Sequence, residues 1–552
     1  MKKIFTLFIF ALVVNASFAQ RYLEPVFDNV TVLQNQVYAL NSTVLLLPNT
    51  GQLTKIPLFT DIYMPEGDTE TDRPLVLVFH TGNFLPPIIN QQIAGSRTDS
   101  SVVEVCTQLA RRGYVAAAVS YRRGWNPAAQ DQPTRALGLI QAAYRGVQDG
   151  RTAVRFFRGS AVAGGNPFGI DPERIAVWGN GTGGYLVLGM VGLSSQTEIA
   201  VTENGPGKFL LDTDGDGVVE TPMVLPIFHG DINGVDTTVV PSDIFGLPPG
   251  DTSNFGFHVP FSSDIALSIN IGGALGDISW LNDNTTPTIS VQSAFDQFAP
   301  YDDEVLVVPT TNDPIVRVQG AQQIGAAQEA AGNNQMWRDF AFNDPITELA
   351  VSNSAVAGHP YYEGVFPWVR PRNSFDQDEG VVINWWNPDD VSAGSGIPGV
   401  PFPSDGIPFN MLPNAAGTST FHEDGLILNE NMGPEKSKAN LDTIFSYVLP
   451  RTCIALGLDC DLAGFSSLRQ LEASEVGLAI SPNPTQDVAY IQTDNFNFNE
   501  VRVFDLQGRL VASEDGLNTS FYNLRRNGLP SGMYAVQIRF EQGIITQKLL
   551  FN

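Results

Sequence analysis

The densest group of side chains that could do chemistry is an acidic turn. Asp212, Asp214 and Asp216 occupy alternate positions of the stretch DTDGDG, and Glu220 follows four residues later. Carboxylates at this spacing are typical of the first half of a calcium loop, although the twelfth position holds Met223 instead of a bidentate glutamate. We therefore expect a structural calcium ion here, and the alternative is a polar turn rich in Asp-Gly steps.

The three cysteines divide into a pair and a single residue. Cys453 and Cys460 enclose a short apolar stretch, and in an exported protein this spacing favours a disulfide. Cys106 occupies an apolar position of a helical pattern, so we expect a small buried side chain without a catalytic role.

The elements that position such residues alternate between strand and helix in the first part of the chain. Alternating or solid apolar runs predict strands, and apolar residues at spacings of three and four predict helices. Strands are expected at 54–67, 75–80, 114–121 and 171–179, with helices at about 102–113 and 135–157 between them. This order predicts an α/β fold with a mostly parallel sheet and right-handed crossovers.

The alternation of strands and helices stops after residue 192 and resumes after residue 262. After a helix at 185–192, residues 194–262 are irregular and are expected to form a cap insertion or lid. Strands and helices follow, and a last helix closes the large domain, which we expect to span residues 20–461.

The N-terminus has the pattern of a secretory signal peptide. Lys2 and Lys3 precede an apolar run from Ile4 to Val14, and small residues end the segment at Ala19. The run is too short to cross a bilayer, which takes about 20 apolar residues. We expect cleavage after residue 19, a mature chain outside the inner membrane, and no transmembrane segment.

The charge balance excludes two classes of partner. The 58 acidic residues outnumber the 31 Lys and Arg residues, which gives the 552-residue chain a net charge of −27. Such a surface repels phosphate backbones and anionic headgroups, so we expect no nucleic-acid binding.

The C-terminal part is expected to be a separate domain. After a linker at 462–476, residues 477–552 form short alternating strands separated by turns, which predicts a small β-sandwich. The motifs SPNP, VFDLQGRLV and LPSGMYAVQI resemble the C-terminal sorting domain of the type IX secretion system in Bacteroidetes. The resemblance implies contact with that machinery, transport across the outer membrane, and release or surface attachment.

Three segments of the large domain resemble the α/β-hydrolase superfamily, near its carboxylesterase and lipase branch. They are HTGN at 80–83, VSYRRG at 119–124 and DPERIAVWGNGTGGYL at 171–186. The resemblance implies an α/β-hydrolase fold with a cap insertion and a small-molecule ester or related ligand. It also implies an oxyanion hole built from Gly82, Asn83 and Thr182.

The catalytic positions of that family are only partly kept. The elbow G-x-S-x-G reads GNGTG, so Gly181 stands where the family carries its serine and cannot attack a carbonyl. The resemblance places Asp296 at the acid position and favours His359 as the base. His422 is the alternative base, and a purely structural role is open for either histidine.

Two routes could replace the serine. Thr182 has a hydroxyl, although the start of a helix also favours threonine as a cap. A water held beside Gly181 could instead be activated by His359 and Asp296. Four aromatic residues are expected near the mouth of the site, either in the core or as a wall for ligand: Phe366, Trp368, Trp385 and Trp386.

Three functions follow from these residues. The first is a secreted hydrolase of carboxylic esters that works without a serine. The second is a catalytically impaired relative that keeps its cleft to bind a ligand or partner. The third is a structural surface protein that uses the fold as a scaffold.

Overall fold

The computed structural model describes residues 21–552 except 283–284, 297, 309–310, 381, 391–405, 464, 466–470, 472, 495, 506–509 and 541–542. The predicted signal peptide, residues 1–19, lies outside the described residues. The chain divides into a large unit, Met1–Met336 with Glu348–Cys460, and a small unit, Trp337–Thr347 with Asp461–Asn552.

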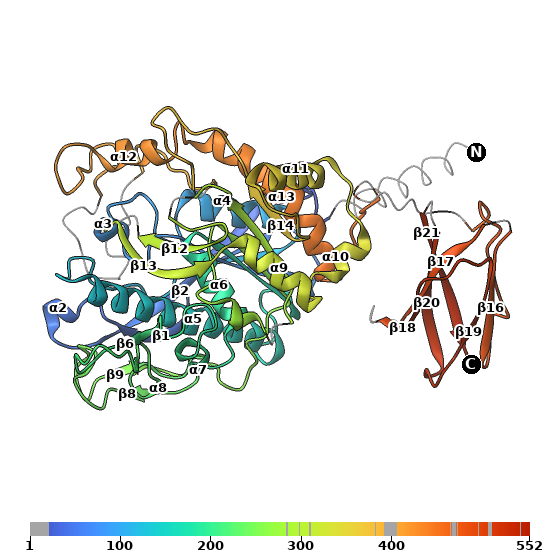
Figure 1. Cartoon of the computed structure of the whole chain (residues 1–552), viewed down its shortest axis with the longest axis horizontal. Coiled ribbons are helices and arrows are strands. Elements are labelled where there is room, and N and C mark those ends of the chain that lie inside the picture. Colours follow the sequence, from blue (N-terminus) through green and yellow to red (C-terminus); the bar gives the residue numbers. More distant parts are fainter. Residues whose placement is uncertain are drawn as a thin grey trace. The chain divides into compact units, whose positions relative to one another are not determined.

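The large unit is built on an eight-stranded sheet (Figure 1). Its strand order is β1-β2-β4-β3-β5-β10-β11-β14; β2 runs antiparallel to both of its neighbours, and every other pair is parallel. The strands are β1 (Val30–Thr43), β2 (Thr54–Pro65), β3 (Arg73–Phe79), β4 (Val115–Val119), β5 (Ile170–Asn180), β10 (Leu267–Ile271), β11 (Thr288–Ser293) and β14 (Val365–Trp368). The predicted α/β-hydrolase fold is confirmed.

The central strands are solid apolar runs because helices cover both faces of the sheet. Every residue of β3, β4 and β10 is buried, as expected for parallel strands between two helical layers. The longer helices are α4 (Ser100–Arg111), α5 (Gln132–Val162), α6 (Thr182–Gly192), α9 (Ala321–Ala331), α11 (Pro345–Ala357) and α13 (Pro434–Ala455). The short helices are α2 (Leu47–Thr50), α3 (Pro87–Asn90), α7 (Thr197–Ala200), α8 (Pro226–His229), α10 (Gln335–Phe340) and α12 (Phe421–Leu428).

Two glycines let α5 pack closely on α6. A Cβ at Gly146 would lie 2.5 Å from Leu186 Cδ2, and a Cβ at Gly150 would collide with Met190. On the opposite side of the sheet, α13 covers β5 through an edge-to-face contact between Phe445 and Trp178, with ring centroids 5.7 Å apart. The start of α6 is thus held between the sheet and the longest helix.

The insertion at 194–262 packs beside α5 and β1. It contains α7, α8 and two small hairpins, formed by β6 (Leu210–Leu211) with β7 (Thr221–Pro222) and β8 (Thr238–Val239) with β9 (Thr252–Asn254). Arginines of α5 donate into it: Arg155 Nη1 to the carbonyl of Asn233 at 2.6 Å, and Arg151 Nη1 to the Asn233 side chain at 2.9 Å. In Figure 1 these elements lie on the side of the large unit away from α12.

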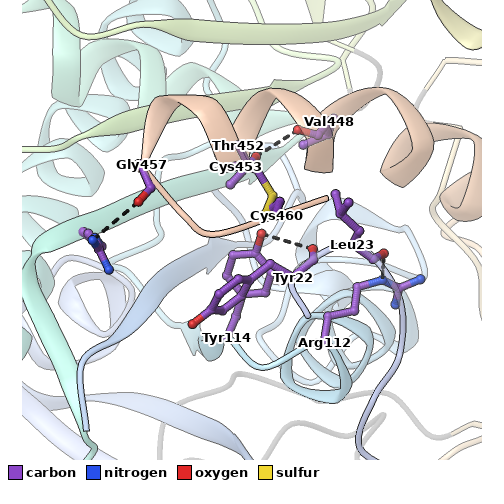
Figure 2. Close-up of a disulfide and its surroundings, with 10 residues drawn as sticks. Tyr22, Leu23, Arg112, Tyr114, Val448, Thr452, Cys453, Gly457 and Cys460 are labelled. Carbon is purple, nitrogen blue, oxygen red and sulfur yellow. Dashed lines mark hydrogen bonds between the residues drawn. A yellow bond between two sulfur atoms is a disulfide. The ribbon is translucent and has the colours of Figure 1, made fainter. Parts of the chain in front are cut away.

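A disulfide closes the C-terminal end of the large unit. Cys453 in α13 is bonded to Cys460, as the sequence predicted, and Cys106 is buried and free. Figure 2 shows the disulfide beside the edge-to-face pair of Tyr22 and Tyr114. The first described residues pack on the segment between α4 and β4.

The small unit contains two antiparallel sheets. One has the order β15-β16-β19 and the other β18-β17-β20-β21. The strands are β15 (Ala479–Ser481), β16 (Val488–Gln492), β17 (Phe498–Phe504), β18 (Leu510–Glu514), β19 (Phe521–Arg525), β20 (Gly532–Phe540) and β21 (Gly543–Phe551). Alternate residues of β20 are buried, and apolar side chains of both sheets share one core. This is the predicted β-sandwich.

Among the residues that the structure describes, no helix combines the length and hydropathy needed to span a membrane.

Candidate functional site

The turn between β5 and α6 has the sharp geometry that its glycines predict. Gly181 has φ 52° and ψ −114°, and its N–H donates to the carbonyl of Ile271 at 2.8 Å. A Cβ at Gly179 would collide with the carbonyl of Gly183, and a Cβ at Gly183 would collide with the carbonyl of Phe79 in β3. The close approach of strand, turn and helix therefore requires small residues on both sides of Gly181.

This turn opens into a cavity of about 240 Å³. Gly181, Thr182 and Tyr185 line it from the turn and the first turns of α6, and Asp296 lines it from the segment after β11. Most of the remaining wall is apolar: Phe84, Ile93, Leu139, Phe298, Leu306, Trp386, Phe421 and Leu428. The cavity has the apolar body and few polar groups of a small-molecule site.

The loop after β3 supplies one edge of the cavity. Thr81 and Asn83 line it, whereas Gly82 does not. Gly82 has φ 118°, and a Cβ there would lie 2.5 Å from the Cα of Gly95. The N–H of Thr182 is 3.4 Å from Thr81 Oγ1. Two of the three predicted oxyanion residues, Asn83 and Thr182, thus reach the cavity.

Asp296 is a half-buried carboxylate with one oxygen satisfied. Its Oδ1 accepts the N–H groups of Phe298 at 2.8 Å and Ala299 at 3.0 Å. Burial raises the pKa of Asp296 to about 6; the two backbone N–H groups oppose that rise, and the nearby carboxylate of Asp378 adds to it. Within the described residues, no basic side chain forms an ion pair with Asp296.

Neither candidate base lies in the cavity. His359, between α11 and β14, is 3.9 Å from Asp302 and lies in an outer hollow of about 620 Å³ that also touches Asp296. The Nδ1 atom of His422 in α12 accepts a hydrogen bond from Trp386 Nε1 at 2.9 Å. No hydrogen bond between described residues joins either histidine to Asp296. Both assignments therefore stay predictions.

The other three histidines are structural. His80 and His229 are buried, which lowers their pKa values to about 3 and about 4, so both are neutral. A ring nitrogen of His80, Nδ1, is 2.6 Å from the carbonyl of Thr81, and His258 Nε2 is 2.7 Å from the carbonyl of Tyr38. None of the five histidines of the chain lines the cavity.

The structure adds two residues that the sequence analysis missed. Tyr185 follows Thr182 by three residues on the same face of α6, a spacing that could have identified it. Gly380, from the segment after β14, lies against Asp296: a Cβ there would be 3.1 Å from Asp296 Oδ2. No local pattern marks Gly380, because that segment has no periodicity.

Of the four aromatic residues expected near the site, Trp386 lines the cavity. Phe366 and Trp368 are buried in β14, and the Phe366 ring packs on Tyr447 with centroids 5.2 Å apart. Trp385 packs in the cluster of apolar side chains around Trp386.

The acidic turn lies in the insertion and away from the cavity. The carboxylates of Asp212, Asp214, Asp216 and Glu220 are exposed and offer oxygens within 4.8 Å of one another. Converging carboxylate oxygens fit the ligand preference of calcium. No residue of the insertion lines the cavity. The cavity lining therefore does not support the prediction that the insertion is a cap.

Comparisons with known proteins agree with this architecture. Residues 60–214 match the BD-FAE family model, an esterase-like α/β-hydrolase domain, and residues 479–552 match the secretion system C-terminal sorting domain. The protein is therefore a secreted or cell-surface protein with an α/β-hydrolase-fold domain and a type IX sorting domain. No curated protein is significantly similar to the chain.

Several solved structures of one thermophilic esterase are similar to part of the chain. Native Est2 of the Planctomycetes species Thermogutta terrifontis is 17% identical over 48% of this chain and 72% of its own, with a TM-score of 0.25. The same esterase phosphorylated by paraoxon is 16% identical over 50% and 74%, with a TM-score of 0.26. At such scores these likenesses carry no argument, and the fold assignment rests on the strand order of this protein.

Proposed function

We propose that this secreted α/β-hydrolase-fold protein binds a small ligand in the cavity beside Gly181 and does not hydrolyse esters through an acyl-enzyme. What supports the proposal is that glycine stands at two places where catalysis needs a side chain. Gly181 occupies the nucleophile position, and the residue that lies against Asp296 Oδ2 is Gly380, which has no imidazole to pair with the carboxylate. The triad order of the fold, nucleophile, acid, then histidine, matches the chain order of Gly181, Asp296 and Gly380.

This site has neither a nucleophilic serine nor an imidazole beside Asp296, which distinguishes it from a site that lacks only its serine. A serine hydroxyl attacks only when a base takes its proton, and an isolated serine is a weak nucleophile at neutral pH. The cavity retains what binding requires: a mostly apolar wall and the half-buried carboxylate of Asp296.

A second candidate is direct hydrolysis by a water molecule. It is favoured by one observation, the pKa of about 6 at Asp296, which suits a general base near neutral pH. Thr182, which also lines the cavity, is the other group that could replace the serine.

The test is hydrolysis of a p-nitrophenyl ester series by the full secreted chain and its variants. We expect no turnover by the natural protein or by Gly181→Ser, because the serine variant still lacks an adjacent imidazole. Turnover by the natural protein that is lost in Thr182→Ala, His359→Ala or Asp296→Asn would refute the proposal.

The other parts of the chain support two further proposals. The acidic turn binds calcium with a structural role in the insertion, which its converging carboxylates support. The sorting domain interacts with the type IX secretion machinery, which its family match supports.

A further inference from the structure

We infer that the ligand of the cavity is a small organic cation with an apolar body, whose ammonium group pairs with Asp296. The inference rests on the proposed binding function and specifies its ligand class. It is carried by the charges that line the cavity and by one carboxylate oxygen that receives no hydrogen bond from the described residues.

The charged side chains that line the cavity are all acidic. Asp296, Asp378 and Asp424 line the cavity, and no Lys, Arg or His does so among the described residues. Asp378 pairs with Arg372 at 3.1 Å, and the Asp424 carboxylate accepts a hydrogen bond from Ser419 Oγ. Neither Asp424 nor Asp296 has a basic partner among the described residues, and of these two only Asp296 lacks a side-chain donor. Asp296 is therefore the carboxylate with an oxygen left for a ligand.

The free oxygen of that carboxylate favours a donor that carries positive charge. Both backbone N–H groups go to Asp296 Oδ1, and no described residue donates to Oδ2. A buried ion pair often contributes no net binding free energy, because both charged groups lose their hydration when they are buried. Asp296 is half-buried and has lost part of its hydration in the folded protein, so pairing with a cation offsets part of that free-energy cost. A carboxylate or phosphate ligand would instead add repulsion.

Tyr185 also lines the cavity and adds no charge to it. Its hydroxyl oxygen has less than 1 Å² of exposed surface and no hydrogen-bond partner in the described part of the chain, so it is closed to a ligand in the cavity. Burial raises the pKa of Tyr185 far above its usual range, and the Asp296 carboxylate raises it further, so the tyrosine stays neutral. Asp296 is therefore the group that pairs with an ammonium ion.

The rest of the cavity wall determines the size and the apolar character of the ligand body. Phe298, Phe421, Trp386 and Leu139 offer apolar surface and aromatic faces, which attract both hydrocarbon and cations. A cavity of about 150 Å³ holds benzene. At about 240 Å³, this cavity holds a phenyl ring with a short alkylammonium chain.

Binding of such a cation depends on the protonation of Asp296. As the pH falls through about 6, Asp296 takes a proton and the amine, still charged, loses its partner. Other titratable and charged groups also face Asp296. Within the cavity these are Asp378, Asp424 and Tyr185, and across the outer hollow they are Tyr301, Asp302, Glu304, His359, Arg370 and Arg372. An Asp296 variant therefore separates the contribution of Asp296 from that of these groups.

The experiment compares three probes of one shape by calorimetry with the full secreted chain at pH 7.5. These are 2-phenylethylamine, the neutral 2-phenylethanol and the anionic phenylacetate. We expect the amine to bind at least about tenfold more tightly than the alcohol, and phenylacetate to bind most weakly. The amine preference should decline at pH 5.

Variants assign the preference to Asp296. In Asp296→Asn we expect the amine to bind no more tightly than the alcohol. Asp302→Asn, in the outer hollow, is the matched control and should keep the preference. Thermal unfolding of each variant confirms that it is folded.

Three results would overturn the inference: equal or tighter binding of the alcohol or the acid, an amine preference that survives in Asp296→Asn, or no amine binding up to about 10 mM. Hydrolysis of p-nitrophenyl acetate is measured in the same samples. Turnover by the natural protein refutes the proposed binding function, whereas absence of both turnover and amine preference refutes only the ligand class.

Discussion

At the scale of single residues, the site is defined by two glycines and one carboxylate. Gly181 keeps the strained turn of a nucleophile elbow without the nucleophile. Gly380 has a backbone conformation that any residue can adopt, so it is not required by its φ angle. Its small size leaves Asp296 in contact with the cavity, and a larger side chain there would press on the carboxylate.

The raised pKa of Asp296 predicts how stability depends on pH. Its pKa rises from 3.8 to about 6 on folding, so the folded protein prefers the protonated form. This contribution is complete below pH 3.8 and is lost as the pH rises through about 6. We expect Asp296→Asn to be more stable than the natural protein by about 1–2 kcal/mol above pH 6.5, with the difference shrinking toward pH 4.

Urea denaturation at pH 4, 5, 6, 7 and 8 checks this difference. Asn can keep the hydrogen bonds from Phe298 and Ala299 because both go to one oxygen. Asp302→Asn, whose carboxylate lies near His359, serves as the control. A constant difference across the series would show that Asp296 has an ordinary pKa.

At the scale of elements, the central sheet could be predicted from the sequence, whereas the position of a catalytic base could not. Solid apolar runs such as 75–80 and 114–121 can be stable only between two helical layers, so β3 and β4 were evident from sequence. His359 follows Asp296 in the chain as a triad base must, and linear order could not reveal that it faces Asp302. The insertion at 194–262 was recognisable by composition, but its packing depends on arginines spaced along α5.

The insertion also carries the calcium prediction. We expect calcium to bind the acidic turn with a Kd of about 0.1–1 mM, because the loop is exposed and lacks the twelfth-position glutamate. Calorimetry with CaCl₂ on the chelator-treated protein measures it. Asp214→Asn with Asp216→Asn should abolish the heat.

Asp243→Asn, an exposed carboxylate of the same insertion, should leave calcium binding unchanged. Equal heats from the double variant and the natural protein would mean that the turn is held only by its internal hydrogen bonds, such as that from the Gly217 N–H to Asp212 at 2.9 Å.

At the scale of the whole molecule, the surface is more acidic than the net charge of −27 suggests. Several of the few basic residues are buried: Arg122, Arg145, Arg151, Arg155, Arg158 and Arg451. The negative field that remains outside attracts cations and repels anions over about a Debye length, 8 Å at physiological salt. It favours the approach of an amine to the cavity and opposes that of a fatty acid.

The sorting domain predicts where the protein accumulates. Without residues 477–552 we expect the chain to remain in the cell envelope, because the recognised domain is missing. Immunoblots of medium, surface and cell fractions from the natural host measure this. Gly181→Ser, which leaves the tail unchanged, should distribute as the natural protein does; normal export of the truncated chain would refute the role of the tail.

The disulfide at the end of the large unit has a consequence for digestion by exopeptidases. A carboxypeptidase that trims the chain from its C-terminus meets Cys460, which is bonded to Cys453 inside α13. The Tyr114 hydroxyl donates to the carbonyl of Tyr22, and Arg112 Nε donates to that of Leu23, so the first described residues are tied to the segment between α4 and β4 (Figure 2). Trimming should stall at the disulfide ring and leave the cavity-bearing unit whole.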